Sequence, residues 1–490
     1  MVNKRIMVDM SATLIHHGHT RLLKKASSYG DVIIGLTTDD EILKKKGYIP
    51  ELDYNSRKEI LQSIKYVKEV VPTPWKINDN ILLEYNIDLL VHGDDNTNNV
   101  DIKKLLIFPR TEGVCSSDLR KNSFNIINNI KKNILLNPGP ATTTDTVKLA
   151  QVVPDICPRE NEFGNLMKDV SHELTNLIAN SQEYSTILFG GSGTAAVESI
   201  LTSVVQDNKA ILIVNNGAYG KRMCEIAKRY NVNYIEFRSS PIEQIELNKL
   251  ETKIKSHSNI SHIALVHNET TTGLLTDLNQ IGNLVKKHKI ELVVDGMSSF
   301  GAIPIDMIKS NISFLAASSN KNIQGMAGVG FVIANKKSLE TIKNVSPKTF
   351  YLSLYEQYEN FKIKNQMRFT PPVQTIYALK QAINELKFEG IENRYIRYSN
   401  SWNVLTEFLK ENNIKYLVQD KDHSKIITSI VLPEKINFTH MHDYFYNRDF
   451  TIYPGKIEEY NTFRIANIGN IDHNDLEIFC ELLKKYLDNK

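Results

Sequence analysis

Short apolar runs alternate with amphipathic segments in the first 121 residues of the chain. Residues 20–29 and 57–67 have the apolar spacing of helices. Four apolar runs predict strands, at residues 4–9, 31–37, 87–93 and 105–108. Strands that alternate with helices form parallel sheets, whose ligands bind where strands end and helices begin. The pattern therefore predicts a small, Rossmann-like α/β domain over residues 1–121.

Residues 134–490 show the same alternation on a larger scale. Further apolar runs predict strands there, at residues 184–189, 211–214, 262–267, 290–295 and 314–317. They predict a large α/β domain, followed from about residue 390 by a smaller C-terminal α/β lobe. Residues 122–133 are rich in Asn and Lys and predict a polar linker between the two domains.

The bulk composition narrows the possible partners and the location. The chain has 490 residues and a net charge of +3, which indicates no nucleic-acid partner. Its four cysteines form no CxxC pair, which favours a reducing compartment and argues against a zinc site. No apolar run approaches membrane-spanning length, and the first residues contain no cleavage site. We therefore expect a cytoplasmic protein with no membrane partner.

Two predicted strands of the large domain end in residues with suitable chemistry for catalysis. Lys321 follows the turn Ser318-Ser319-Asn320, and Asp295 closes the run 290–295. A desolvated lysine can form a Schiff base with an aldehyde cofactor. A carboxylate can keep the nitrogen of a pyridine ring protonated. The pair is typical of a pyridoxal phosphate site, although a lysine after a strand is often simply a surface residue.

A His-x-Gly-His element, His16-His17-Gly18-His19, follows the first predicted strand. Gly18 lets a phosphate approach the backbone, and a helix N-terminus supplies amide donors. Two imidazoles on one helix face can stabilise charge on a triphosphate as pyrophosphate leaves. The alternative is a histidine pair with a structural role. Metal binding would require further ligands.

The first domain resembles the cytidylyltransferases of the glycerol-3-phosphate and ethanolamine-phosphate type, within the HxGH nucleotidyltransferase superfamily. The resemblance includes the HxGH element and the segments Lys44-Lys45-Lys46, Asn55-Ser56-Arg57-Lys58, Gly93-Asp94-Asp95 and Arg110-Thr111-Glu112-Gly113-Val114-Cys115-Ser116-Ser117. It implies that His16, His19, Lys46 and Arg110 are catalytic. It also implies that Arg110, Thr111, Ser116 and Ser117 hold the triphosphate of CTP, and that Arg57, Trp75 and Asp94 border the nucleotide. Mg2+ is implied on the CTP phosphates, with no protein ligands of its own.

One segment departs from this family. Its members usually carry Gly-(Thr/Cys)-Phe-Asp before HxGH, whereas this chain has Met10-Ser11-Ala12-Thr13. The acidic position is therefore Thr13. Two interpretations follow: an active cytidylyltransferase that dispenses with the acid, or a domain that binds a nucleotide as a sensor.

The large domain resembles the 2-aminoethylphosphonate–pyruvate transaminases, which are fold-type I pyridoxal phosphate enzymes. The motifs occur in the family's order, as Asn-Pro-Gly-Pro140, Gly-Ser192-Gly-Thr, Asn-Gly-Ala-Tyr219-Gly, His-Asn-Glu269-Thr-Thr-Thr-Gly, Val-Asp295-Gly-Met-Ser-Ser and Ser-Asn-Lys321-Asn-Ile-Gln-Gly. The resemblance implies that Lys321 is the Schiff-base lysine and that Asp295 pairs with the pyridine nitrogen. It implies cofactor contacts from Ser192, Gly193, Thr194 and Asn320 to the phosphate, and from Tyr219, Met297 and Thr271 to the ring and its 3′-oxygen.

Two further positions follow from the same resemblance. Thr370, in Arg368-Phe369-Thr370, matches a residue that reaches the cofactor phosphate of a neighbouring subunit, which implies a homodimer. The residues after Pro372 are Val373-Gln374, where the family usually has Thr-His. Arg464 matches the arginine that clamps a carboxylate or phosphonate, since a guanidinium suits both anions. From the residues alone, Arg464 could also be a surface arginine on a strand.

The two resemblances together suggest a bifunctional enzyme of phosphonate biosynthesis. The large domain would convert phosphonoacetaldehyde to 2-aminoethylphosphonate with alanine as donor and pyruvate as product. The first domain would couple that product to CTP, giving CMP-2-aminoethylphosphonate and pyrophosphate. Three alternatives stay open: phosphoethanolamine or glycerol 3-phosphate as the acceptor, a purely regulatory nucleotide-binding domain, and a transaminase of the alanine–glyoxylate type.

Overall fold

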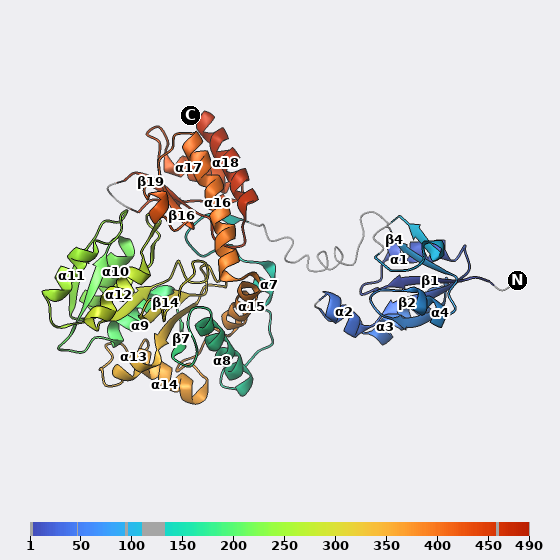
Figure 1. The fold of residues 1–490 in the computed structure, drawn as a ribbon, viewed down its shortest axis with the longest axis horizontal. Helices are drawn as coiled ribbons and strands as arrows, with labels where there is room; N and C mark the ends of the chain where they lie inside the picture. Colours follow the sequence, from blue (N-terminus) through green and yellow to red (C-terminus); the bar gives the residue numbers. More distant parts are fainter. Residues whose placement is uncertain (1–2, 47, 94–96, 110–132, 457–459, 490) are drawn as a thin grey trace. The chain divides into compact units, whose positions relative to one another are not determined.

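The computed structural model describes residues 3–46, 48–93, 97–109, 133–456 and 460–489 (Figure 1). The chain separates into two compact units, Met1–Lys131 and Lys132–Lys490. The linker predicted at residues 122–133 lies, except for Asn133, outside the described residues. No helix in the described ranges is long and apolar enough to cross a membrane.

Unit 1 contains a five-stranded parallel sheet in the order β3-β2-β1-β4-β5 (Figure 1). Its strands are β1 (Arg5–Met10), β2 (Asp31–Thr37), β3 (Val67–Thr73), β4 (Leu89–Gly93) and β5 (Leu105–Phe108). Its helices are α1 (His17–Ala26), α2 (Asp39–Lys46), α3 (Tyr54–Gln62), α4 (Asp79–Glu84) and the 3-10 turn η1 (Ile102–Lys104). The apolar runs bury their side chains on both faces of the sheet, as parallel strands require.

The four strands predicted for this unit are confirmed, with small shifts at their ends, but β3 is absent from the prediction. The helix predicted over residues 57–67 is too long at its C-terminal end, because α3 ends at Gln62 and Val67 already belongs to β3. β3 lies at the edge of the sheet, and it carries exposed Lys68 and Glu69 and also Pro72. These residues are tolerated at an edge, and they hide the apolar alternation of a strand.

The larger part of unit 2 is a seven-stranded sheet in the order β7-β15-β14-β13-β10-β8-β9, in which only β15 runs antiparallel to its neighbours (Figure 1). The strands are β7 (Tyr184–Gly190), β8 (Ala210–Asn215), β9 (Tyr234–Arg238), β10 (Ile260–Val266), β13 (Glu291–Asp295), β14 (Ile312–Ser318) and β15 (Val329–Asn335). A hairpin of β11 (Asn268–Glu269) and β12 (Leu274–Leu275) follows β10.

Helices cover both faces of this sheet. Alternate strand residues such as Leu212 and Ile213 belong to two different core clusters, because successive side chains point to opposite faces. One face packs against α8 (Asn161–Asn176), α11 (Leu247–Lys255), α12 (Leu278–His288) and α15 (Val373–Glu389). The other packs against α9 (Gly193–Ser203), α10 (Ala218–Arg229), α13 (Lys336–Thr341) and α14 (Leu354–Lys364). The short helix α7 (Asp145–Leu149) packs beside α15.

The rest of unit 2 forms a smaller lobe with its own core. A three-stranded antiparallel sheet has the order β16-β19-β18, made of β16 (Ile427–Val431), β19 (Thr462–Ala466) and β18 (Tyr453–Pro454). The helices α16 (Ile391–Glu411), α17 (Phe438–Tyr446) and α18 (His473–Asp488) pack on it. The remaining short elements are β6 (Ile134–Leu135), its partner β17 (Phe450–Thr451) and the turn η2 (Asp420–Asp422).

Buried neutral histidines make the stability of unit 2 sensitive to acid. Burial lowers the pKa of His262 to about 4 and that of His267 to about 3. The unfolded chain, in which a histidine has a pKa near 6.5, therefore binds more protons than the folded one, and stability is lost as the pH falls below about 6.5.

At about pH 5 each such histidine costs ~2 kcal/mol of unfolding free energy. We expect His262→Gln to lose less free energy of unfolding than the wild type between about pH 7 and pH 5, as measured by denaturant titration at both values. Comparison of the two losses removes any constant effect of the substitution. Equal losses in the two proteins would contradict this assignment.

Candidate active sites

Lys321 and Asp295 lie at the same end of two neighbouring parallel strands in unit 2. Asp295 closes β13 and is paired in register with Ala316 of β14, and Lys321 follows the end of β14 at Ser318. The Lys321 Nζ donates a hydrogen bond to the Pro138 carbonyl oxygen. Burial lowers the pKa of the Lys321 amine to about 8, against the opposing effect of Asp295. A larger fraction of this lysine is therefore the nucleophilic free amine than in an exposed lysine.

Asp295 is a buried carboxylate that accepts a hydrogen bond from a neutral backbone amide. Its Oδ1 accepts from the Met297 amide at 3.0 Å. Burial raises its pKa to about 6, while the positive charges of Arg222 and Lys321 work in the opposite direction. The position of this side chain is fixed by its strand, because β13 is paired with β10 on one edge and with β14 on the other. An acid held here suits a ring nitrogen that must stay protonated.

An anion cradle lies where β7 ends and α9 begins. Ser192 is the N-cap of α9 and makes no side-chain cap bond among the described residues, so amide donors at this helix start remain available to a ligand. Gly193 has no room for a side chain, since a Cβ there would lie 2.0 Å from the Met297 Sδ. Arg222 Nη1 lies 3.4 Å from Thr194 Oγ1. The structure thus brings Ser192, Gly193, Thr194 and Met297 together, as expected.

Asn320 closes the other side of the Lys321 loop. Its side-chain oxygen accepts from Ser318 Oγ at 3.0 Å, and its backbone oxygen accepts from Ala141 N at 3.0 Å. These bonds tie the turn that carries Lys321 to the end of β14 and to the loop after β6. The phosphate contact expected for Asn320 stays a prediction.

Tyr219 and Thr271 both contact the carboxylate of Glu269, a residue whose role was not predicted from the sequence. Glu269 Oε1 accepts from Thr271 Oγ1 at 2.6 Å and from Thr271 N at 3.0 Å, and Glu269 Oε2 lies 3.4 Å from Tyr219 N. The Arg222 guanidinium lies 4.9 Å from the centre of the Tyr219 ring. Arg222 was not named as a site residue from the sequence. Its spacing could have identified it, because Arg222 is three residues after Tyr219 and therefore lies on the same face of α10.

Arg464 is 1% exposed, which excludes the alternative of a surface arginine. It lies on β19, where its Nε donates to Pro454 O at 3.0 Å and its Nη1 to Thr270 O at 3.2 Å. It has no ion pair among the described residues. A buried guanidinium held only by carbonyls retains its positive charge for an incoming anion. This is the arrangement expected for a substrate carboxylate or phosphonate.

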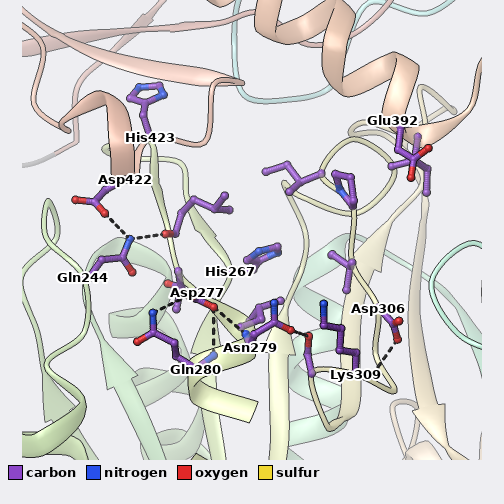
Figure 2. A pocket seen from close by; sticks show the side chains of 18 of the residues that line it. Gln244, His267, Asp277, Asn279, Gln280, Asp306, Lys309, Glu392, Asp422 and His423 are labelled. Atoms are coloured by element: carbon purple, nitrogen blue, oxygen red, sulfur yellow. Dashed lines mark hydrogen bonds between the residues drawn. The ribbon is translucent and has the colours of Figure 1, made fainter. Parts of the chain in front are cut away.

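Thr370 is exposed and follows the half-buried Phe369, whose ring stacks on Tyr351, outside this group of contacts. Its expected partner is a second subunit, so its role stays a prediction. A separate cavity of about 710 Å3 is lined by residues from α12, η2, the start of α16 and the loops next to them. Gln244, His267, Asp277, Glu392 and His423 are among the lining residues (Figure 2). Gln244 Nε2 and the Asp277 carboxylate are engaged there in local hydrogen bonds. Neither Lys321 nor Arg464 lines this cavity.

The residues at the first site fit pyridoxal phosphate. A half-buried amine with a lowered pKa, a buried acid, an open helix N-terminus and an aromatic residue are the groups that this cofactor needs. Lys321 would bind its aldehyde, Asp295 its ring nitrogen, and Ser192 with Gly193 and Thr194 its phosphate. When bound, the cofactor supplies an electron sink for the carbanion that forms at the substrate Cα.

In unit 1 the HxGH element forms the start of α1. His16 is the N-cap of the helix, and its Nδ1 accepts from Gly18 N at 3.2 Å, while His19 Nδ1 accepts from His16 N at 3.3 Å. The rings of His16 and His19 have centroids 4.0 Å apart. Burial, together with His16, lowers the pKa of His19 to about 4. The two imidazoles therefore lie together at a helix N-terminus, the location suited to a triphosphate.

Lys46 and Trp75 lie together next to the loop before HxGH. Lys46 Nζ lies 3.4 Å from Ser11 Oγ and 5.2 Å from the centre of the Trp75 ring. Thr13 is fully buried in this loop, and its Oγ1 has no hydrogen-bond partner among the described residues. Asp94, Arg110, Thr111, Ser116 and Ser117 lie outside the described residues, so their expected roles stay predictions.

Arg57 differs from its expected place at the border of the nucleotide. It is fully buried, and its guanidinium donates to the carbonyl oxygens of Leu52, Ser11 and Thr37 and to the Asp39 carboxylate. These four hydrogen bonds use most of the N–H donors of Arg57, because a guanidinium has only five. Arg57 therefore supports the loop at Ser11 from within the domain, and we expect it to position the site.

Comparisons with known proteins agree with this geometry. A model of cytidylyltransferase-like domains matches residues 12–121, and a model of class-V aminotransferases matches residues 148–445. The chain therefore belongs to the class-V aminotransferases and carries an N-terminal cytidylyltransferase-like domain. Within the class, it is related to the 2-aminoethylphosphonate–pyruvate transaminases.

A 2-aminoethylphosphonate–pyruvate transaminase of Phocaeicola vulgatus is 38% identical, over 72% of this chain and 98% of the relative. A bifunctional phosphonoacetaldehyde hydrolase/aminoethylphosphonate transaminase of Clostridioides difficile is 37% identical over 79% of this chain, which spans 60% of that relative's length. An alanine–glyoxylate aminotransferase structure from Nostoc sp. has a TM-score of 0.69 at 22% identity, and covers 73% of this chain and 96% of its own. This last likeness concerns the fold, which is that of fold-type I aminotransferases.

Gly139 gives a direct test of the Lys321 pocket. It has a φ of 127°, and a Cβ there would lie 2.4 Å from Lys321 Nζ. We expect Gly139→Ala to displace the amine and reduce the transamination rate by about 100-fold. Gly164→Ala on α8, where a Cβ would meet its nearest neighbour at 3.4 Å, is the matched control and should retain activity. Equal rates in the two variants would argue against a tightly packed lysine pocket.

Proposed function

We propose that this chain makes 2-aminoethylphosphonate and then activates it with CTP. Unit 2 would transfer the amino group of alanine to phosphonoacetaldehyde, leaving pyruvate. Unit 1 would join the phosphonate product to CTP, giving CMP-2-aminoethylphosphonate and pyrophosphate. One observation supports the transaminase reaction most strongly. Arg464 is a buried guanidinium without an ion pair in the described residues, and it lies close to the lysine of a transaminase site.

In the transaminase half-reactions, the residues of unit 2 would bind, orient and move one proton. Arg464 would hold the phosphonate or the carboxylate, which turns the Cα–H bond of the bound amine toward Lys321. Lys321 Nζ would take the proton from Cα and return it at the cofactor's C4′, because its lowered pKa leaves a free amine near neutral pH. Tyr219 and Met297 would hold the two faces of the ring, and Thr271 its 3′-oxygen. Thr370 would complete the site from a second subunit in a homodimer.

In the nucleotidyl transfer, the phosphonate oxygen would attack the α-phosphorus of CTP. His16 and His19 at the start of α1 would donate hydrogen bonds to the triphosphate as negative charge moves onto the leaving pyrophosphate. Lys46 and Arg110 would neutralise the transferring group, with Thr111, Ser116 and Ser117 around the phosphates and Trp75 and Asp94 at the nucleoside. Mg2+ would be bound by the CTP phosphates. A phosphonate presents almost the same oxyanion as the phosphate monoesters used by the enzymes that unit 1 resembles.

A second function for unit 1 is favoured by one observation. Thr13 replaces the family's acid and is buried without a partner in the described residues, so no carboxylate occupies this position. A nucleotide-binding domain that regulates a single-function transaminase would fit that replacement. It would bind CTP without releasing pyrophosphate, and CTP would change the transaminase kinetics.

The transaminase half is tested by the absorbance of the bound cofactor. Mixing the holoenzyme with 2-aminoethylphosphonate, and separately with alanine, should convert the aldehyde form of the cofactor to its amine form. Conversion by alanine, with reversal by glyoxylate but no response to 2-aminoethylphosphonate, would instead identify an alanine–glyoxylate enzyme. The acceptor of unit 1 is tested by pyrophosphate release from CTP with 2-aminoethylphosphonate, phosphoethanolamine and glycerol 3-phosphate in parallel.

A further inference from the structure

Glu269 is a fully buried carboxylate without an ion pair in the described residues. Its hydrogen bonds come from neutral donors, the amide and hydroxyl of Thr271 and the more distant amide of Tyr219. Gly217 lies against it so closely that a Cβ there would be 2.5 Å from the Glu269 Cδ. A buried charge with only neutral partners is costly, and such a group takes up a proton easily.

The charged side chains around Glu269 are those of the anion site. Arg464 donates a hydrogen bond to the carbonyl oxygen of Thr270, the next residue along the chain, and the charge of Glu269 raises the pKa of both Arg464 and Lys456 against the effect of their burial. Lys456 lies in the loop after β18, two residues beyond the Pro454 carbonyl that holds Arg464, and its Nζ has no partner in the described residues. Asp295 approaches from β13 with a negative charge.

The proposed transaminase must hold two kinds of anion at this one place. A phosphonate near neutral pH carries up to two negative charges, while the carboxylate of alanine or pyruvate carries one. Two other positive groups of the site are committed to the cofactor, since Arg222 lies beside the anion cradle and Lys321 would hold the cofactor aldehyde. Arg464 and Lys456 therefore supply the two positive charges that face the substrate anion, and an ionised Glu269 cancels one of them. The positive charge of the site would then equal the single negative charge of a carboxylate. With a neutral Glu269 it would equal the two negative charges of a dianionic phosphonate.

The structure assigns Glu269 as the residue that adjusts this site to its two substrates, by taking a proton from solvent when a dianionic phosphonate binds and releasing it when a carboxylate takes its place. The inference rests on the proposed transaminase function. Burial raises the pKa of Glu269 to about 7, so the free site is divided between both forms near neutral pH. A bound dianion raises that pKa further, because like charges disfavour ionisation, and a monoanion raises it less.

Proton uptake by the holoenzyme measures this directly. Methylphosphonate and methanesulfonate are tetrahedral anions of the same shape, and only the first can carry two charges. Calorimetric titration at about pH 8, in buffers of different ionisation enthalpy, gives the number of protons taken up as each anion binds. Glu269 is then mostly ionised, so binding of methylphosphonate should take up close to one additional proton, and methanesulfonate clearly less.

Glu269→Gln separates this proton from any that belongs to the ligand. The variant should bind methylphosphonate with the uptake reduced by that additional proton, and its affinity for methylphosphonate relative to methanesulfonate should rise up to tenfold at about pH 8. Glu251→Gln is the matched control, because Lys287, His288 and Lys255 lower the pKa of that carboxylate to about 2 and keep it ionised throughout.

Each outcome decides one question. Equal proton uptake by wild type and Glu269→Gln, or no binding of methylphosphonate, would overturn the role of Glu269. The same holoenzyme is tested with 2-aminoethylphosphonate by cofactor absorbance. A protein that converts its cofactor with 2-aminoethylphosphonate but shows no Glu269-dependent proton keeps the proposed function and loses this inference. A protein that does not respond to 2-aminoethylphosphonate loses the proposed function itself.

Discussion

Replacing Lys321 with alanine is expected to reduce transamination by at least about 1,000-fold. This amine would both bind the cofactor aldehyde and move the proton at the substrate Cα, and its charge acts on the Asp295 carboxylate. Pyrophosphate release from CTP should be unchanged, because Lys321 belongs to unit 2 and the HxGH element to unit 1. The measurements are single-turnover cofactor absorbance and pyrophosphate release on the same preparation.

Lys343→Ala is the matched control for this experiment. Lys343 is exposed, follows α13 and has no ion pair in the described residues, so its removal should leave both activities unchanged. A Lys321→Ala protein that still converts alanine at a rate within a few-fold of wild type would show that this lysine is not the proton carrier.

The second large effect is expected at the start of α1. His19→Ala should reduce pyrophosphate release by about 100- to 1,000-fold, the range for loss of one donor to developing charge. His19 is a neutral imidazole in the free domain because its pKa is lowered to about 4. A bound triphosphate would raise that pKa, since nearby negative charge favours the protonated ring. The substitution therefore removes both a hydrogen bond and the charge that the substrate itself induces.

His17→Ala is the control, because His17 is the adjacent histidine of the same motif and is exposed. It should retain pyrophosphate release, and both variants should retain transamination. Equal losses in the two variants would indicate that the helix start, and not the His19 ring, was damaged.

Much of the fold could be predicted because buried parallel strands are continuous apolar runs. β2 and β13 are recognised in this way, and β13 ends at Asp295 of the lysine site. β3 could not be recognised, because an edge strand tolerates the charges of Lys68 and Glu69 and the ring of Pro72. The edge strands β5 and β7 were nevertheless predicted, because each contains a continuous apolar run. The interior strand β15 was not among the predicted strands, although six of its seven residues are buried.

The sites divide in a similar way. Lys321, Asp295 and Arg464 stand in local motifs, and the structure brings their charges close together, with Asp295 and Arg464 buried and Lys321 half-buried. Arg57 also stands in a motif, yet its place inside unit 1 depends on four acceptors that are spread over residues 11 to 52. Glu269 also stands in its family motif in the sequence. The role inferred for it depends on the absence of an ion pair to its carboxylate in the described structure. Sequence patterns show which residues are present and not which partners they lack.

The central claim is that one chain both makes 2-aminoethylphosphonate and activates it. The most direct test supplies the purified holoenzyme with phosphonoacetaldehyde, alanine, CTP and Mg2+ and follows all phosphorus species by NMR. The proposal predicts that the aldehyde signal gives way to 2-aminoethylphosphonate and then to a coupled phosphonate–phosphate signal, with pyrophosphate formed in equal amount. Accumulation of 2-aminoethylphosphonate while CTP stays intact would contradict it and leave unit 1 as a nucleotide-binding domain of a transaminase.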